Sequence, residues 1–296
     1  MLAAAAREAI RRASPPALRA AAFSARAPGD APQPGPAGAG PAPDTPPAPK
    51  SDRTLNPEKA FRKLIAAPPV SLEIPMRWDD RDVLAEQHGP LGRAVLWAGG
   101  FFSEESRTLR AAIHLVEEVS LAGEPMPFLQ AAGLPAEDFR TGHMARCLHT
   151  WLLISRLRSE GKAGNTLGQE LYDQFQHDVE KRVHAAGVRF RVTKWLKELE
   201  EAFYGSSHAY DKALITGVQG DLAEAIWRNM FFKAEGKKDD AAVVAKYVAR
   251  EIECLSITDS KALMKGNIRF SCISSMRPVR PRPAAPPEGA PAAGGA

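Results

Sequence analysis

Three side chains within residues 165–187 have the spacing of a metal site. His177, Glu180 and His184 are separated by three and then four residues, so one face of a helix would present all of them. Di-iron helix bundles, however, need Glu-x-x-His from each of two helices and further glutamates from two more. Residues 165–187 contain one reversed copy of that motif. We therefore interpret the three residues as a solvated helix face and expect no metal.

The other residues that could carry chemistry are scattered. His143 and His149 are six residues apart, on different sides of a helix, which favours core or capping roles over metal ligation. The sequence has no GxSxG turn, no Walker A loop and no GxGxxG fingerprint, and Gly99-Gly100 is only a turn signal. We expect neither a cofactor nor an enzymatic activity.

A basic strip with two aromatic residues is the strongest local charge feature. Residues 181–197 include six lysines and arginines and no acidic residue, with Phe190 and Trp195 among them. Such a strip is suited to RNA phosphates or to an anionic membrane surface. The alternative is a solvated helix end whose two aromatic side chains point into the core. The basic residues of the strip are Lys181, Arg182, Arg189, Arg191, Lys194 and Lys197.

The elements that must position these residues are helices. Apolar residues recur with a period near 3.6 between Gly and Pro stops, as in the apolar rail from Leu171 to Val183 that follows the capping residue Asn165. We predict a compact all-α domain of seven or eight mostly antiparallel helices, disordered at both ends. The expected helices are 56–67, 103–120, 136–161, 165–187, 193–205, 207–217, 220–232 and 240–255.

The segment 220–232 has more large apolar residues than one helix face can hold. Its apolar stripe includes Ile226 and Trp227, whereas Phe232 lies beyond the stripe, on the side of Arg228. We therefore expect the core of this chain to cover Trp227 and a partner protein to cover Phe232.

The first 26 residues have the composition of an organellar transit peptide, although a disordered basic tail is the alternative. They contain five arginines and one acidic residue, and they have no long apolar run. Without them Lys+Arg falls from 39 to 34 and Asp+Glu from 35 to 34, which excludes a globally basic nucleic-acid binder. We predict a mitochondrial transit peptide (1–26), a disordered Pro/Ala/Gly-rich linker (27–52), one folded domain (53–275) and a disordered tail (276–296).

The cysteines and the hydropathy pattern limit the cellular compartments in which this protein could work. Cys147, Cys254 and Cys272 are far apart and form no CxxC motif, so we expect reduced, mostly buried thiols. No apolar run reaches the roughly 18 residues that a membrane span needs. We expect a soluble or peripheral protein.

Four stretches, in one order and spacing, resemble the ubiquinol–cytochrome c chaperone family of respiratory complex III assembly factors. They are "LHTWLLISRLRSEG" (148–161), "ELYDQFQHDVEKRV" (170–183), "AFYGSSHAYDKAL" (202–214) and "DLAEAIWRNMFF" (221–232), within a resemblance that covers about 85–255. The resemblance implies an all-α protein that is not an enzyme and lies peripherally on the matrix side of the mitochondrial inner membrane. It also implies three partners: newly synthesised cytochrome b, a small partner assembly factor and the mitochondrial ribosome, where fungal members promote cytochrome b translation.

The resemblance also carries over a set of site residues. The partner-binding candidates are Tyr204, Tyr210, Asp211, Arg228, Asn229 and Phe232. Tyr204 and Tyr210 are explained equally well as core residues. A second function stays open on these grounds: a mitochondrial RNA- or ribosome-binding translation factor without client-chaperone activity, which the basic strip would serve.

Overall fold

The structure is a computed structural model, and it describes residues 57–74, 89–123, 126–135, 138–218 and 220–271. The predicted transit peptide, the Pro/Ala/Gly-rich linker and the C-terminal tail lie outside these residues. Nearly all of the predicted folded domain lies within them.

Helices form the fold, as predicted. The described residues contain no strand, and an isolated antiparallel bridge joins Glu73 to Ile268. The all-α prediction is confirmed. In chain order the helices are α2 (Pro57–Ala66), α4 (Pro90–Ala98), α5 (Glu104–Gly123), α6 (Met126–Ala131), α7 (Phe139–Leu157), the 3-10 turn η1 (Arg158–Glu160), α8 (Gly161–Ala185), α9 (Val192–Thr216), α10 (Asp221–Asn229), α11 (Lys238–Ile257) and α12 (Ser260–Met264).

One predicted helix break is absent. The sequence predicts two helices separated near Gly205 and Ser206, but α9 runs through both residues without interruption. Ser206 is fully buried, and its hydroxyl donates a 3.0 Å hydrogen bond to the carbonyl of Phe203 within the same helix. Packing against the core therefore overrides the weak helix propensity of this stretch.

The start of α8 also differs from the prediction. The chain turns at Gly161, where φ is 68°, and α8 begins there rather than at Asn165. Asn165 consequently lies inside the helix and caps nothing. The short helices α4, α6 and α12 have no counterpart among the predicted ones.

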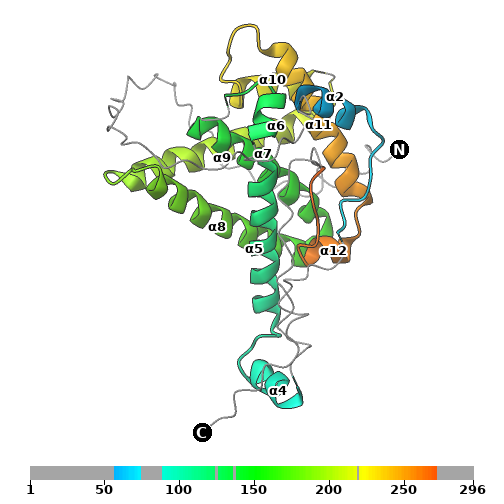
Figure 1. The fold of residues 1–296 in the computed structure, drawn as a ribbon, viewed down its shortest axis with the longest axis vertical. Helices are drawn as coiled ribbons and strands as arrows, with labels where there is room; N and C mark the ends of the chain where they lie inside the picture. The colour runs from blue at the N-terminus through cyan, green and yellow to red at the C-terminus, as the bar shows by residue number, and fades with distance from the viewer. Residues whose placement is uncertain (1–56, 75–88, 124–125, 136–137, 219, 272–296) are drawn as a thin grey trace, which may run out of the picture.

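The central element is α7, which has thirteen buried residues out of nineteen. It contacts α5, α8, α9 and α11, while α10 packs against α9 and α11. Figure 1 shows α8 and α9 as a long hairpin whose tip projects away from the body of the molecule. In the same view α4 lies beyond the far end of α5, and α4 has no buried residue.

Two apolar clusters hold these helices together. The larger surrounds α7 and includes Trp151 and Tyr210, and the smaller joins α8 to α9 through Phe175, Val179 and Phe203. The apolar rail predicted on α8 is confirmed, since each of its members is buried. The smaller cluster also includes Cys147 of α7, so it ties the hairpin to the body.

A buried ion pair ties α11 to two other parts of the chain. Arg250 Nη1 lies 3.0 Å from Glu251 Oε1, and the two side chains are only 7% and 0% exposed. The same guanidinium donates 3.2 Å hydrogen bonds to the carbonyls of Ala67 and Pro68, and the backbone N–H of Ser271 donates to Glu251 Oε2. Burial raises the pKa of Glu251 to about 7.

Both histidines of α7 are core residues. His143 Nε2 lies 3.3 Å from Cys147 Sγ, and His149 Nε2 lies 2.9 Å from the hydroxyl of Tyr247. Burial, together with the positive charge of Arg146, lowers the pKa of His143 to about 4. The imidazole of His143 is therefore neutral at physiological pH.

Two cysteines lie within the described residues. Cys147 and Cys254 are free and buried, and burial raises the pKa of each thiol. Cys272 lies outside the described residues. The expected burial is confirmed for the first two, and their reduced state stays a prediction.

Candidate functional site: a pocket between α7, α8 and α9

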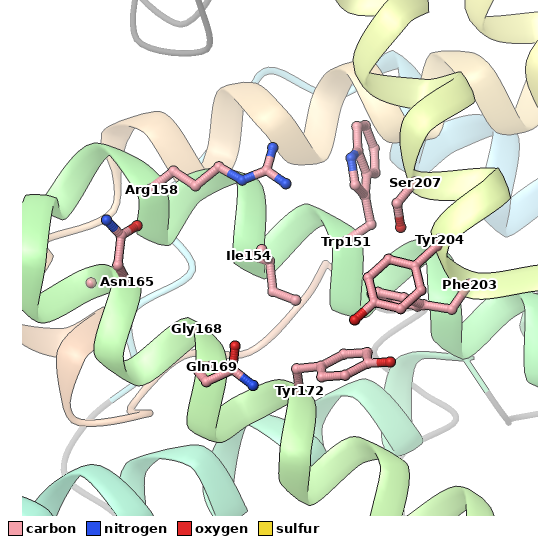
Figure 2. Close-up of a pocket in the computed structure, with 11 residues that line it drawn as sticks. Trp151, Ile154, Arg158, Asn165, Gly168, Gln169, Tyr172, Phe203, Tyr204 and Ser207 are labelled. Carbon is pink, nitrogen blue, oxygen red and sulfur yellow. The ribbon is translucent and has the colours of Figure 1, made fainter. Parts of the chain in front are cut away.

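A pocket of about 230 Å³ opens where α7, η1, α8 and α9 meet. Figure 2 shows its lining side chains around one space. The lining residues are Trp151, Ile154, Arg158, Gly164, Asn165, Gly168, Gln169, Tyr172, Phe203, Tyr204 and Ser207. Three of the four stretches that carry the family resemblance contribute to this lining.

Two glycines on α8 make room for the pocket. A Cβ at Gly164 would lie 2.0 Å from the carbonyl oxygen of Leu157, so only glycine allows the start of α8 to approach the end of α7 this closely. Gly168 is one turn further along and also buried, but a Cβ there would meet nothing within 4 Å. The space beside Gly168 is therefore open pocket.

Aromatic rings form the outer wall. Tyr172 of α8 packs at a centroid distance of 5.1 Å against Phe203 and 5.5 Å against Tyr204, both from α9. The Tyr204 side chain is 54% exposed, so the wall is open to solvent at its edge. Burial and the neighbouring Tyr204 hydroxyl raise the pKa of Tyr172, which keeps its phenol neutral.

The inner wall contains a hydroxyl that lacks a partner. Ser207 is 9% exposed, and its Oγ finds no hydrogen-bond partner among the described residues. A buried polar atom without a partner is costly in a folded protein. A molecule in the pocket that bonds to Ser207 would remove that cost.

Two of the partner-binding candidates, Tyr210 and Asp211, contact residues that line the pocket. Tyr210 is fully buried, with its ring 5.1 Å from that of Trp151, so its assignment to a partner surface is wrong. Asp211 accepts hydrogen bonds from Trp151 Nε1 at 2.8 Å and from Arg158 Nη1 at 3.0 Å. These two residues fix the position of α9 against α7 and η1.

The remaining candidates lie apart from the pocket, on α10 and the loop after it. Arg228 is exposed and pairs with Glu224 at 2.9 Å, and the i,i+4 spacing of the two residues favours such a pair on a helix. Asn229 Nδ2 donates to the carbonyl of Ala225, so its side chain is already bonded within the helix. The structure thus separates the six candidates into two groups.

Phe232 and Trp227 are both partly covered by this chain. Phe232 is 37% exposed, and the guanidinium of Arg140 lies 4.0 Å from the centre of its ring. Trp227 is half-buried against the larger cluster, and its Nε1 donates to the carbonyl of Ala234. The ammonium group of Lys238 lies 4.6 Å from its ring centre.

We expect Trp227→Ala and Phe232→Ala to differ in stability. Trp227→Ala should cost about 1–3 kcal/mol, less than the 3–5 kcal/mol of a fully buried tryptophan, because its ring is only half-buried. Phe232→Ala should cost less than about 1 kcal/mol, which is the scale of an exposed cation–π contact. Denaturant melts of the two variants test this. Equal losses would mean that both rings are core residues.

The basic strip lies at the tip of the α8–α9 hairpin. Phe190 is 86% exposed and Trp195 47% exposed, so the alternative that places both rings in the core is wrong. Arg182 is half-buried and bonded to Asp178 and Ser120, and it therefore takes no part in the exposed surface. The exposed basic residues near the tip are Lys181, Arg189, Arg191, Lys194 and Lys197.

The residues considered for a metal site lie on the outer face of α8. His177, Glu180 and His184 are all exposed, and His184 Nε2 is 3.9 Å from a Glu180 oxygen. In the described ranges no group of three or more His, Cys, Asp or Glu side chains is placed to hold a metal ion. Within the same ranges, no helix combines the length and the apolar character needed to cross a membrane.

Sequence reasoning missed the pocket itself. Its floor comes from Gly164 and Gly168, and its inner wall from Trp151 and Ser207, which are more than fifty residues apart in sequence. The signal available in the sequence is Gly168 alone, inside the predicted helix, where glycine is otherwise unfavourable. Gly164 precedes the predicted start of that helix.

Comparisons with known proteins agree on one family. The model of the family described as ubiquinol-cytochrome C chaperone matches residues 139–270. Ubiquinol-cytochrome-c reductase complex assembly factor 1 of Xenopus laevis is 25% identical over 138 residues, 46% of this chain and 68% of the frog protein. The mouse protein is 24% identical over 144 residues, and the human protein 23%. The match spans 48% of this chain and about half the length (48%) of the mouse and human proteins.

One solved structure shares the fold. The crystal structure of the Cbp3 homolog from Brucella abortus is 26% identical to this chain, with a TM-score of 0.52. The similarity covers 62% of this chain and 99% of that one. Every residue that lines the pocket lies inside the family match.

Proposed function

We propose, from the match of residues 139–270 to the ubiquinol-cytochrome C chaperone family, that this chain is an assembly chaperone for respiratory complex III. The names of the frog, mouse and human relatives support this role. The chain would act by binding rather than by catalysis, on the matrix side of the mitochondrial inner membrane.

We further propose that the client is newly synthesised cytochrome b and that the pocket between α7, α8 and α9 binds it. A membrane subunit without its partners exposes apolar side chains and aggregates. The pocket offers such a side chain an aromatic wall, from Tyr172 and Tyr204, beside space left by Gly168. The observation that carries the proposal is this aromatic-walled space, with Ser207, whose buried Oγ has no partner among the described residues, in its lining.

The Arg228 and Phe232 surface remains a second proposed contact, for the small partner assembly factor. It lies on α10 and the following loop, and neither Arg228 nor Phe232 is among the residues that line the pocket. A client and a partner would then bind without competing for the same residues. Contact with the mitochondrial ribosome is a further proposal that the family resemblance suggests.

A pocket-filling variant tests the client proposal. Gly168→Leu places a side chain into the open space, and glycine is the poorer helix former, so the fold should be retained. In a strain that lacks this protein, the variant should fail to restore complex III and cytochrome b. Mitochondrial pull-downs with the variant should recover at least about tenfold less cytochrome b, which corresponds to about 1.4 kcal/mol of binding energy.

The matched control is Gly205→Leu, on the exposed face of α9. Gly205 also sits inside a helix and has no atom within 4 Å of a built Cβ, but it does not line the pocket. This control should restore complex III fully. Normal cytochrome b recovery with Gly168→Leu, at an unchanged melting temperature, would refute the pocket as the client site.

A further inference from the structure

We propose that the tip of the α8–α9 hairpin binds an anionic lipid surface, with Phe190 and Trp195 inserted among the headgroups. The inference deepens the proposed function and rests on its peripheral location at the inner membrane, because it names the surface that would make the contact. Three observations carry it: the exposure of the two rings, the charge around them and the shape of the tip.

The exposed rings are held in place by an ordered turn. Gly187 and Arg191 both have left-handed backbone angles, with φ of 86° and 54°, and Phe190 lies between them. The half-buried Val188 packs against the smaller apolar cluster, and its N–H donates to the carbonyl of Val183. The tip is therefore anchored through Val188, while Phe190 remains 86% exposed. Two exposed aromatic side chains near one turn, Phe190 and Trp195, with basic residues around them, are typical of an interaction surface.

The charge around the rings is positive. Arg189 and Arg191 form no ion pair with any described residue. Lys194 and Lys197 have only long, exposed contacts of 3.7 and 4.0 Å with glutamates one turn further along α9, and such contacts are weak. Juxtamembrane basic residues are attracted to anionic lipids, and tryptophan favours the headgroup level of a bilayer.

The shape of the tip favours a membrane over RNA. Proteins that bind single-stranded RNA by stacking use a groove that follows the backbone and several aromatic platforms in succession. The tip is instead a convex end that projects from the body (Figure 1). A projecting end with aromatic residues and flanking cations can enter a lipid interface without any rearrangement of the fold.

Vesicle binding by the purified full-length chain tests the proposal. The probes are vesicles of phosphatidylcholine alone and of phosphatidylcholine mixed with phosphatidylglycerol. Phe190→Ser should weaken partition into the anionic vesicles by about tenfold, since a large apolar side chain would no longer leave water. The pair Arg189→Gln and Arg191→Gln should weaken it by about tenfold or more, and the effect should disappear at high salt.

Two matched controls separate the tip from the rest of the surface. Ile257→Ser removes an apolar side chain that is 45% exposed at the end of α11. The pair Lys212→Gln and Lys246→Gln removes two exposed cations from α9 and α11. Both controls should bind the vesicles as the unchanged chain does. Equal losses in the controls and the tip variants would overturn the proposal.

Quenching of Trp195 fluorescence tests whether the tip itself, and not another part of the chain, enters the bilayer. Lipids with brominated acyl chains quench a tryptophan that enters the bilayer, and the difference between the unchanged chain and Trp195→Phe reports Trp195 alone. We expect strong quenching of that component, and no quenching would overturn the proposal. Tip variants that lose RNA binding but keep vesicle binding would also overturn it. These outcomes are independent of cytochrome b recovery, so the two proposals fail separately.

Discussion

Arg250→Met is expected to lower the free energy of unfolding by about 3–5 kcal/mol, because it leaves a buried carboxylate without its partner. Glu251 is fully buried, and Arg250 is its ion-pair partner at 3.0 Å. The same substitution removes the donors to the carbonyls of Ala67 and Pro68. Urea melts of the variant and of the unchanged protein measure the loss.

The loss should depend on pH with a defined sign. The pKa of Glu251 is raised from 4.5 to about 7 by burial, so the folded protein binds the proton more tightly than the unfolded chain does. Its favourable contribution is therefore fully present below 4.5 and is lost as the pH rises through about 7. Without Arg250 the charged form of Glu251 is even less favourable in the folded protein, whereas the neutral form is little affected. The loss of stability in Arg250→Met should therefore be smaller near pH 5 than near pH 8.

The control for this effect is Glu251→Gln, which cannot ionise. It should remove the pH-dependent part of the Arg250→Met defect when the two changes are combined. At each pH the variant must be compared with the unchanged protein, because His143 changes the stability of both with pH in the opposite direction. Its pKa is lowered from 6.5 to about 4, so its contribution is lost as the pH falls through that window. A defect of Arg250→Met that is the same at both pH values would contradict this prediction.

Trp151→Ala is expected to cost about 3–5 kcal/mol, as for other fully buried aromatic residues. Trp151 is 1% exposed, its ring packs on Tyr210, and its Nε1 donates to Asp211. Trp151→Phe retains much of the packing but loses the bond to the carboxylate, so it should cost about 1.5–3 kcal/mol. Guanidinium melts of both variants separate the two contributions.

Trp97→Ala is the matched control for this substitution. Trp97 is 76% exposed on α4, so its removal should change stability by no more than about 0.5 kcal/mol. If Trp151→Phe proved as damaging as Trp151→Ala, the hydrogen bond to Asp211 would account for most of the lost stability. If Trp151→Phe were neutral, Asp211 would contribute little to holding α9 in place.

The sequence predicts the parts of this fold that depend on local pattern. The rail from Leu171 to Val183 is buried because its period matches that of a helix. The break expected near Ser206 is absent because the core packs against that serine and keeps it helical. Local propensity is a weak guide wherever tertiary contacts decide.

The candidate site shows the same division. Motif resemblance identified Tyr204 and Asp211, but the roles of the two residues differ in ways that only the fold reveals. Tyr204 is an exposed part of the pocket wall, whereas Asp211 is bonded to Trp151 and Arg158, more than fifty residues earlier in the sequence. Contacts over that distance depend on how α9 crosses α7, and periodicity within one helix carries no information about the crossing.

The uninterrupted length of α9 has a consequence for how a client would approach. Trp195 and Tyr204 are nine residues apart on one helix, which is about two and a half turns, so the two rings leave the helix on opposite sides. A bilayer that touches Trp195 would therefore leave the Tyr204 side facing water. Because Trp195 and Tyr204 point to opposite sides of α9, the pocket would bind the water-exposed loops of a membrane subunit. The transmembrane helices of that subunit would stay in the lipid.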